Sequence, residues 1–483
     1  MCICSISVST SAAPINVKSS CLFNISKPGY NYSLKNNYKW NKIARCKSYL
    51  PKEDQQIKMK LEEYLNAAVK YNNFQGAVLV EKEGKVILSK GYGMADYENT
   101  IQNTSSTRFA IGSITKQFTA MAIMQLYERG RLKLDDKLSR YYPDFPRGNE
   151  ITIHQLLSHT SGIVNYTMLP EYWQIDPYKI TKDDIFKLLY NNPLDFKPGE
   201  RWNYSNSGYV LLSDIVEKIT GKSYEEYLDK NIFKPLRMKN SGLCMSRDKL
   251  NIKTVGYDGY LDIQPVDDTM SFRGSFGAGS LYSTVEDLYL WEKALDTEKL
   301  VSKKTMNKIF TPYFETFMGA YGYGWYIKGE DKEKTAFHDG IIAGFHSIIS
   351  KYIGINSASI ILSNKSINGS TIYKVENDIN SILLGKDIEL PKEKATIRLD
   401  VKKIDRLLGT YNIEPGYDVV ITREGEHTYV TFTGMERIEL YPISETEFFL
   451  RNMDLTCTFE IGENNEAKSI EINQRGTIYK AIK

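Results

Sequence analysis

The stretch GSITKQFTAMAIMQLYERG, residues 112–130, predicts a helix that is apolar on nearly every side. Apolar side chains fill most positions from Ile114 to Leu126, and a helix that is hydrophobic all round belongs in the interior of a domain. Gly130 is suited to follow its last turn, because glycine readily adopts the left-handed conformation found there. We therefore expect a buried helix from Ile114 to Arg129, with the rest of the domain packed around it.

The start of this helix carries a serine and a lysine three positions apart, Ser113 and Lys116, so the two side chains share a face. Burial lowers the pKa of a lysine, which could then accept the serine proton. Backbone N–H groups at the helix start would lie near a developing oxyanion. A capping serine and a surface lysine would give the same pattern, which recurs at Ser246-Arg-Asp-Lys249. That second match lies in a polar stretch, and we assign it to chance.

Around this helix, the sequence has strand patterns on both sides of a long, mainly helical region. The simplest packing is one mainly antiparallel sheet, flanked by the terminal helices, with a helical subdomain inserted. The pattern predicts helices at 53–71, 208–219 and 370–384, a hairpin of strands at 76–80 and 86–89, a mainly helical region at 105–315, and strands at 323–328, 335–339, 345–352 and 357–363.

The character of the sequence changes after about residue 385. Residues 386–399 have the composition of a linker, and eight short strand candidates with turn signals follow within 400–483. Such spacing is typical of a small antiparallel barrel or sandwich, and we favour the barrel. The predicted fold class is therefore α+β, with a main domain at 53–385 and a C-terminal β-barrel at 400–483.

Residues 1–52 form a leader that we exclude from fold reasoning. The leader holds eight Lys and Arg residues and no Asp or Glu, so the remaining chain is acidic and has no basic stripe for nucleic acid. It resembles an export signal in part and a transit peptide in part, and a disordered extension is the plainer explanation. We expect a secreted or cell-envelope protein, with a cytoplasmic or organellar location as the alternative. No stretch is apolar for long enough to span a bilayer, and the six cysteines show no disulfide framework.

Two further motifs carry side chains suited to catalysis. Tyr204-Ser-Asn206 follows a Lys-Pro-Gly turn and precedes an apolar helix, so its phenol and amide could meet a substrate. His338-Asp-Gly340 ends a predicted strand, where glycine lets a ligand approach the backbone. Alone, each has a plainer explanation as a capping loop or a buried strand histidine.

In this order, the three motifs resemble the signatures of the serine β-lactamase and penicillin-binding protein superfamily. The Tyr-x-Asn and His-x-Gly forms point to its class C-like branch, which includes DD-peptidases, D-amino-acid amidases and family VIII carboxylesterases. The stretches Leu156–Gly162 and Gly279–Ser283 resemble loops of the same family. The resemblance covers about residues 55–385, and the C-terminal strands resemble a lipocalin-like appendage.

This resemblance implies a serine hydrolase that needs no cofactor and no metal. It leaves open whether the lysine or the tyrosine is the first base. The implied roles are nucleophile for Ser113, activating partner for Lys116, acid and base toward the leaving group for Tyr204, substrate positioning for Asn206, His338 and Gly340, and oxyanion donation by the backbone N–H groups of Ser113 and Ile341.

His338 stands where many relatives have a lysine that offers a fixed positive charge. Histidine is mostly neutral at pH 7, so we expect weak carboxylate recognition and slow turnover of β-lactams. On this basis, any carboxylate-directed activity should rise as the pH falls through about 6.5, the ordinary pKa of histidine.

Other functional classes find little support in the sequence. No Gly-x-Ser-x-Gly elbow, zinc motif or phosphate loop occurs, and we expect Gly274–Gly279 to be a flexible loop and His159 and His346 to be structural. The favoured substrate is a D-amino-acid peptide, amide or ester, including peptidoglycan peptides. The alternatives are a penicillin-binding sensor that acylates without turnover and a structural relative with vestigial catalysis. The oligomeric state stays open.

Overall fold

The computed structural model describes residues 50–71, 74–176, 178–244, 254–258, 264–266, 269–365, 369–392, 396–414, 416–433, 437–450, 455–474 and 477–483. The chain divides into two compact units, Met1–Gln55 and Gln56–Lys483. Of the leader predicted at 1–52, residues 1–49 lie outside the described residues. The second Ser-x-x-Lys match, at 246–249, also lies outside them. The first described helix is α1 (Lys52–Tyr71), which buries Leu61 and Leu65.

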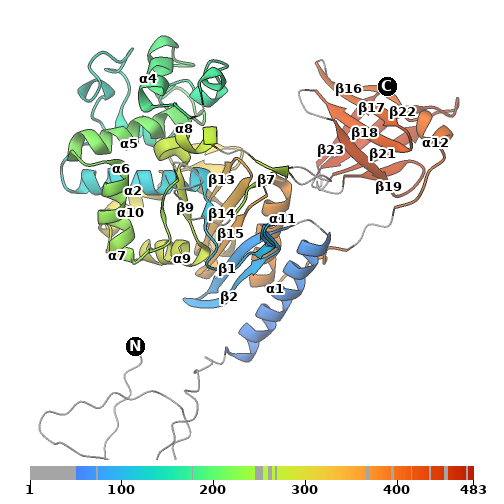
Figure 1. Ribbon diagram of the computed structural model, residues 1–483, viewed down its shortest axis with the longest axis horizontal. Coiled ribbons are helices and arrows are strands. Elements are labelled where there is room, and N and C mark those ends of the chain that lie inside the picture. The colour runs from blue at the N-terminus through green and yellow to red at the C-terminus, as the bar shows by residue number, and fades with distance from the viewer. Residues whose placement is uncertain are drawn as a thin grey trace, which may run out of the picture. The chain divides into compact units, whose positions relative to one another are not determined.

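The main sheet is antiparallel and joins strands from opposite ends of the domain (Figure 1). Strand β1 pairs with β15, with Ala77 opposite Leu362, which brings the N-terminal hairpin beside strands that follow the helical region. In sheet order the eight strands are β10 (Phe314–Thr316), β11 (Gly319–Tyr321), β12 (Tyr326–Lys328), β13 (Thr335–Ile342), β14 (Phe345–Tyr352), β15 (Ser357–Ser363), β1 (Gly76–Lys82) and β2 (Lys85–Tyr92).

Both faces of this sheet are covered in its middle. Successive strand residues point to opposite faces, yet every residue of β15 is buried. Helices α9 (Val285–Ala294) and α11 (Gly369–Leu383) both pack on β15. One strand starts later than predicted: β12 begins at Tyr326 instead of 323, because Gly324 turns the chain there with a φ of 78°.

Helix α2 (Thr115–Glu128) forms the centre of the helical region, as the sequence predicts, and is buried at every position from Thr115 to Leu126. The other helices of this region are α3 (Ile153–Leu157), α4 (Lys182–Asn191), α5 (Asn206–Thr220), α6 (Tyr224–Leu228), α7 (Lys234–Leu236), α8 (Thr269–Gly279) and α10 (Lys303–Ile309). Small sheets accompany them: β3 (Met94–Asp96) with β4 (Ile101–Gln102), β5 (Phe109–Ala110) and β6 (Gly242–Leu243) with β9 (Leu281–Ser283), and β7 (Tyr257–Asp258) with β8 (Gln264–Pro265).

The C-terminal strands close into a barrel of eight antiparallel strands, preceded by α12 (Val401–Asp405). Alternate residues fill its interior; on β21, Leu455, Cys457 and Phe459 point inward and are buried. The strands are β16 (Gly409–Glu414), β17 (Tyr417–Glu424), β18 (His427–Phe432), β19 (Ile438–Pro442), β20 (Glu447–Phe449), β21 (Leu455–Ile461), β22 (Ala467–Gln474) and β23 (Thr477–Ile482).

The predicted fold class is confirmed: an α+β domain built on a large antiparallel sheet with an inserted helical region, and a closed C-terminal β-barrel. Of the helices in the described ranges, none is both long and apolar enough to cross a membrane.

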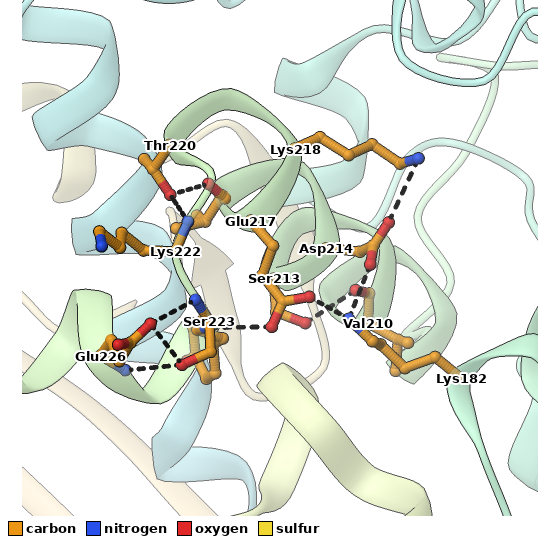
Figure 2. A network of polar contacts seen from close by, with 12 residues as sticks. Lys182, Val210, Ser213, Asp214, Glu217, Lys218, Thr220, Lys222, Ser223 and Glu226 are labelled. Atoms are coloured by element: carbon orange, nitrogen blue, oxygen red, sulfur yellow. Dashed lines mark hydrogen bonds and ion pairs between the residues drawn. The ribbon is translucent and has the colours of Figure 1, made fainter.

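A polar network fixes the position of helix α5 (Figure 2). Lys182, at the start of α4, binds both Asp214 and Glu217 of α5, with Nζ 2.7 Å from the Asp214 carboxylate. Asp214 also accepts a hydrogen bond of 2.7 Å from the Tyr142 hydroxyl, and Glu217 accepts one of 2.8 Å from the backbone N–H of Tyr224. The network therefore ties α4 and the start of α6 to α5.

Replacing Lys182 with methionine should lower the thermal midpoint by a few degrees. Glu217 would lose the Lys182 ion pair and Asp214 would keep only the Lys218 amine, 3.8 Å away, which costs on the order of 1–2 kcal/mol. The matched control is Lys179→Met, because the Lys179–Asp176 pair is more exposed and should contribute little. Equal midpoints for the two variants at one scan rate would contradict the assigned role.

Candidate active site

Ser113 lies in a short 3₁₀ turn, Gly112–Ile114, that leads directly into α2. Strand β13 crosses this turn at very close range, because both crossing points are glycines. A Cβ atom on Gly340 would lie 2.0 Å from the carbonyl oxygen of Ile111 and 2.8 Å from the backbone nitrogen of Ser113. Gly112, whose φ is 50°, makes the reciprocal contact. Any larger side chain at either glycine would separate the turn from the strand.

The same crossing brings the two predicted oxyanion donors together. The backbone nitrogen of Ser113 lies beside Gly340, and a Cβ on Gly112 would lie 2.9 Å from the backbone nitrogen of Ile341. The Ser113 side chain is only partly buried, so a substrate can reach it. This arrangement suits stabilisation of an oxyanion, and that role stays a prediction.

Lys116 is completely buried one turn after Ser113, and its amine has three oxygen neighbours. Nζ lies 3.0 Å from Ser113 Oγ, 2.8 Å from Asn206 Oδ1 and 2.8 Å from the carbonyl oxygen of Ala278. Burial lowers the pKa of Lys116 well below its ordinary value, although the nearby Asp339 carboxylate opposes that shift.

The three contacts suit either charge state of the amine, because a charged lysine donates three hydrogen bonds and a neutral one donates two and accepts one; burial, which lowers the pKa, favours the neutral form. A carbonyl and an amide oxygen can only accept, so they take the two N–H donors of the uncharged Lys116. The remaining lone pair then faces the Ser113 hydroxyl, which can donate to it at 3.0 Å. A neutral Lys116 in this position can take the Ser113 proton, and that role stays a prediction.

Asn206, the first residue of α5, has a fixed amide orientation. Its backbone N–H donates to Asn165 Oδ1 at 3.1 Å, and its Nδ2 donates to Thr167 Oγ1 at 3.3 Å. Oδ1 is therefore left to accept from Lys116. The side chain places the lysine and closes one side of the site.

The Tyr204 ring lies against the same amine, with Lys116 Nζ 4.8 Å from the ring centroid. Burial raises the pKa of Tyr204 well above its ordinary value, although its hydrogen bond with Ser113 opposes that shift. Tyr204 is therefore a neutral phenol that can donate a proton. Of the two candidate bases, the electrostatics favour Lys116 for the first proton transfer.

The comparison with known families agrees with this geometry. The family model described as "Beta-lactamase" matches residues 61–377, well over half of the chain. The chain belongs to the beta-lactamase family. A second model, described as a domain of unknown function (DUF3471), matches residues 393–480. The resemblance inferred from the three motifs is thus confirmed, and family membership makes the protein a hydrolase.

Relatives of this beta-lactamase family member include penicillin-binding proteins. Penicillin-binding protein 4* of Bacillus subtilis is 30% identical over 435 residues, which cover 85% of this chain and 95% of that protein. The octameric penicillin-binding protein homologue from Pyrococcus abyssi is 27% identical, with a TM-score of 0.61 over 88% of this chain and 99% of that chain. A D-amino acid amidase from Ochrobactrum anthropi shares the fold, with a TM-score of 0.58 at 22% identity over 69% of this chain and 97% of that one.

The structure corrects the expectation for His338. The residue lies beside Tyr204, at 6.3 Å between ring centroids, but both of its ring nitrogens are engaged within the protein. Nδ1 lies 2.6 Å from the carbonyl oxygen of Asp339, and Nε2 lies 3.2 Å from the Tyr321 hydroxyl. Burial lowers the pKa of His338 to about 4, despite the nearby Asp339 carboxylate. The rise in activity expected near pH 6.5 therefore has no basis in this residue, which stays neutral there.

Sequence reasoning missed two contributors to the site. Ala278, whose carbonyl binds Lys116, lies in Gly274–Gly279, where we expected a flexible loop; the structure has helix α8 there. Phe276 interrupts that helix with a φ of 38° just before the contact, and no sequence pattern signals this. Tyr321 was also missed, although His159, which contacts it, lies in a stretch that resembles a family loop.

His346 is the least satisfied of the buried histidines. Among the described residues, neither of its ring nitrogens has a hydrogen-bond partner, and the nearest carboxylate oxygen, Asp339 Oδ2, is 3.9 Å away. Burial lowers its pKa to about 4, although Asp339 opposes the shift.

Acid should therefore destabilise the protein between about pH 6.5 and 4. In that window the unfolded chain binds protons at His338 and His346 while the folded chain does not, so stability falls as the pH falls, by roughly 1.4 kcal/mol per pH unit for each histidine. Replacing His346 with leucine should raise the thermal midpoint at pH 5 more than at pH 7.5. The same difference at both pH values would show that His346 does not titrate in this way.

Proposed function

We propose that the protein is a serine hydrolase that forms an acyl-enzyme on Ser113 from a D-amino-acid peptide, amide or ester. The observation that carries this proposal is the contact of 3.0 Å between the Ser113 hydroxyl and the buried Lys116 amine, whose other two neighbours are acceptors only. The names of the relatives, a penicillin-binding protein and a D-amino acid amidase, support this substrate class.

Acylation begins with transfer of the Ser113 proton to Lys116 as Oγ attacks the substrate carbonyl carbon. The negative charge that forms on the carbonyl oxygen is stabilised by the backbone N–H groups of Ser113 and Ile341. The bond to the leaving group then breaks, and the leaving nitrogen or oxygen takes a proton from Tyr204. Lys116 returns its proton to Tyr204, so both groups regain their starting states.

Deacylation repeats these steps with water as the nucleophile. Water gives a proton to Lys116 and attacks the carbonyl carbon of the acyl-enzyme ester. The bond to Ser113 Oγ then breaks, the carboxylic acid product leaves, and Oγ recovers its proton. We further propose that the site recognises the carboxylate of β-lactams weakly and turns β-lactams over slowly. The neutral His338 and the carboxylate of Asp339 give no fixed positive charge at the third motif for a β-lactam carboxylate.

The test is mass spectrometry of the intact protein after incubation with a fluorescent penicillin, a nitrophenyl ester and a D-alanyl-D-alanine peptide. An adduct that maps to Ser113 and disappears with time supports a hydrolase. An adduct on Ser113 that persists with every substrate supports the sensor instead. Adducts only at other residues, or none with any compound, would refute the proposal.

A further inference from the structure

The Tyr204–Asn206 loop and strand β13 are connected by three buried side chains that the catalytic steps do not use. The backbone N–H of Ser205 donates to His159 Nδ1 at 3.1 Å. His159 Nε2 lies 3.1 Å from the Tyr321 hydroxyl, which lies 3.2 Å from His338 Nε2. His338 Nδ1 completes the series at the carbonyl oxygen of Asp339, 2.6 Å away. His159, Tyr321 and His338 are at most 1% exposed.

The two ends of this series determine which ring nitrogen carries the proton in each neutral histidine. A backbone N–H can only donate, so His159 Nδ1 must be an acceptor, and the neutral ring carries its proton on Nε2. A carbonyl oxygen can only accept, so His338 must carry its proton on Nδ1 and present a lone pair on Nε2. The Tyr321 hydroxyl therefore accepts from His159 and donates to His338. The neighbouring Tyr209 hydroxyl donates to Leu157 O at 2.8 Å, so toward Tyr321 its oxygen can only accept, and it competes with His338 for the single Tyr321 proton.

We infer that His159, Tyr321 and His338 are positioning residues, joined in one proton-ordered chain that holds the Tyr204–Asn206 loop against β13. The same series of side chains also supports Tyr204 directly, because the His159 ring packs on the Tyr204 ring with centroids 4.4 Å apart. His338 has no ring nitrogen left for a substrate. The kinetic consequences rest on the proposed function, whereas the proton order does not.

This series of hydrogen bonds requires both histidines to be neutral. A proton added to His159 Nδ1 would face the Ser205 N–H, and a proton added to His338 Nε2 would end its hydrogen bond from the Tyr321 hydroxyl. The groups that face the three side chains are the Asp339 carboxylate, which favours protonation of His338, the Lys116 side chain, which opposes it when charged, and the phenols of Tyr204, Tyr209 and Tyr326. Burial outweighs the carboxylate and lowers the pKa of both histidines.

The first test needs no substrate. In the full chain labelled with ¹⁵N-histidine, long-range ¹H–¹⁵N spectra report which ring nitrogen carries the proton, and single substitutions assign the five histidines. We expect the Nε2–H form for His159 and the Nδ1–H form for His338 from pH 5 to 8. An Nε2–H or protonated His338 at pH 7 would overturn the inference, even if Ser113 proves to be acylated.

Tyr321→Phe should shift the resonances of both His159 and His338. The matched control is Tyr323→Phe, because Tyr323 is equally buried and contacts a different histidine, His154, at 2.7 Å. That variant should shift His154 alone. Unchanged His159 and His338 resonances in Tyr321→Phe would refute the connection.

The second test separates positioning from substrate binding. Tyr321→Phe should slow acylation about tenfold, as expected for one lost positioning hydrogen bond, while Tyr323→Phe stays near wild type. His338→Gln, whose Oε1 can still accept from Tyr321, should retain more activity than His338→Leu. For each of these two His338 variants, the loss of activity on a substrate with a free carboxylate should equal its loss on the methyl ester of that substrate. A loss confined to the free carboxylate would assign His338 to substrate binding.

Discussion

Replacing Ser113 with alanine should abolish formation of the acyl-enzyme and lower hydrolysis by on the order of 10⁶-fold, the loss that follows removal of the nucleophile in a serine hydrolase. The substitution removes one oxygen atom at the start of α2 and leaves the backbone N–H of residue 113 in place. The oxyanion site and the substrate pocket should therefore persist. Binding of substrate, measured by fluorescence anisotropy with a slowly reacting penicillin, should change little.

The chain contains its own matched control in the second Ser-x-x-Lys match. Ser246→Ala makes the same change in another Ser-x-x-Lys sequence, which lies in a polar stretch. This variant should retain wild-type acylation of the fluorescent penicillin. Labelling that survives in Ser113→Ala, or disappears in Ser246→Ala, would remove Ser113 from the role of nucleophile.

The features of the fold that were predictable are those encoded in local patterns. The apolar sequence of α2 predicts its burial, and the alternation of β21 and its neighbours predicts a barrel. The hairpin of β1 and β2 and the strands β13 to β15 are each recognisable, and antiparallel pairing then places them in one sheet. The predicted domain boundaries themselves stay a prediction.

Only those residues of the candidate site that lie in the sequence motifs were predictable. Ser113, Lys116, Tyr204 and Asn206 do meet, since each lies in a short signature. The sequence could not show that Ala278 supplies a carbonyl, because any residue can do so and a backbone turn at Phe276 decides it.

His338 shows a second limit of sequence reasoning. The identity of a histidine does not reveal its neighbours, and the hydroxyl of Tyr321, 17 positions earlier, lies 3.2 Å from Nε2 of the side chain that we had expected to position the substrate. Burial and pairing are properties of the folded chain, and they changed both the pKa and the role of this side chain.

Replacing Lys116 with methionine should lower the acylation rate by about 10³-fold or more, within the range attributed to a general base together with its positioning. Methionine is similar in length and suits a buried site, but it has no lone pair to accept the Ser113 proton and no N–H for Asn206 and Ala278. In the wild type, acylation should fall as the pH falls through the lowered pKa of Lys116, because a protonated amine cannot act as a base. Stopped-flow acylation across pH should show that fall in the wild type and a flat, slow profile in Lys116→Met.

Tyr204→Phe provides the contrast that distinguishes the base from the acid. This variant keeps the Lys116 amine, so its acylation should fall at low pH as in the wild type. It should lose far more activity on an amide than on a nitrophenyl ester, because an amide nitrogen needs a proton to leave and nitrophenolate does not. If Tyr204→Phe instead removed the pH dependence while Lys116→Met kept it, the phenol would be the first base, and the assignment of Lys116 to that step would be wrong.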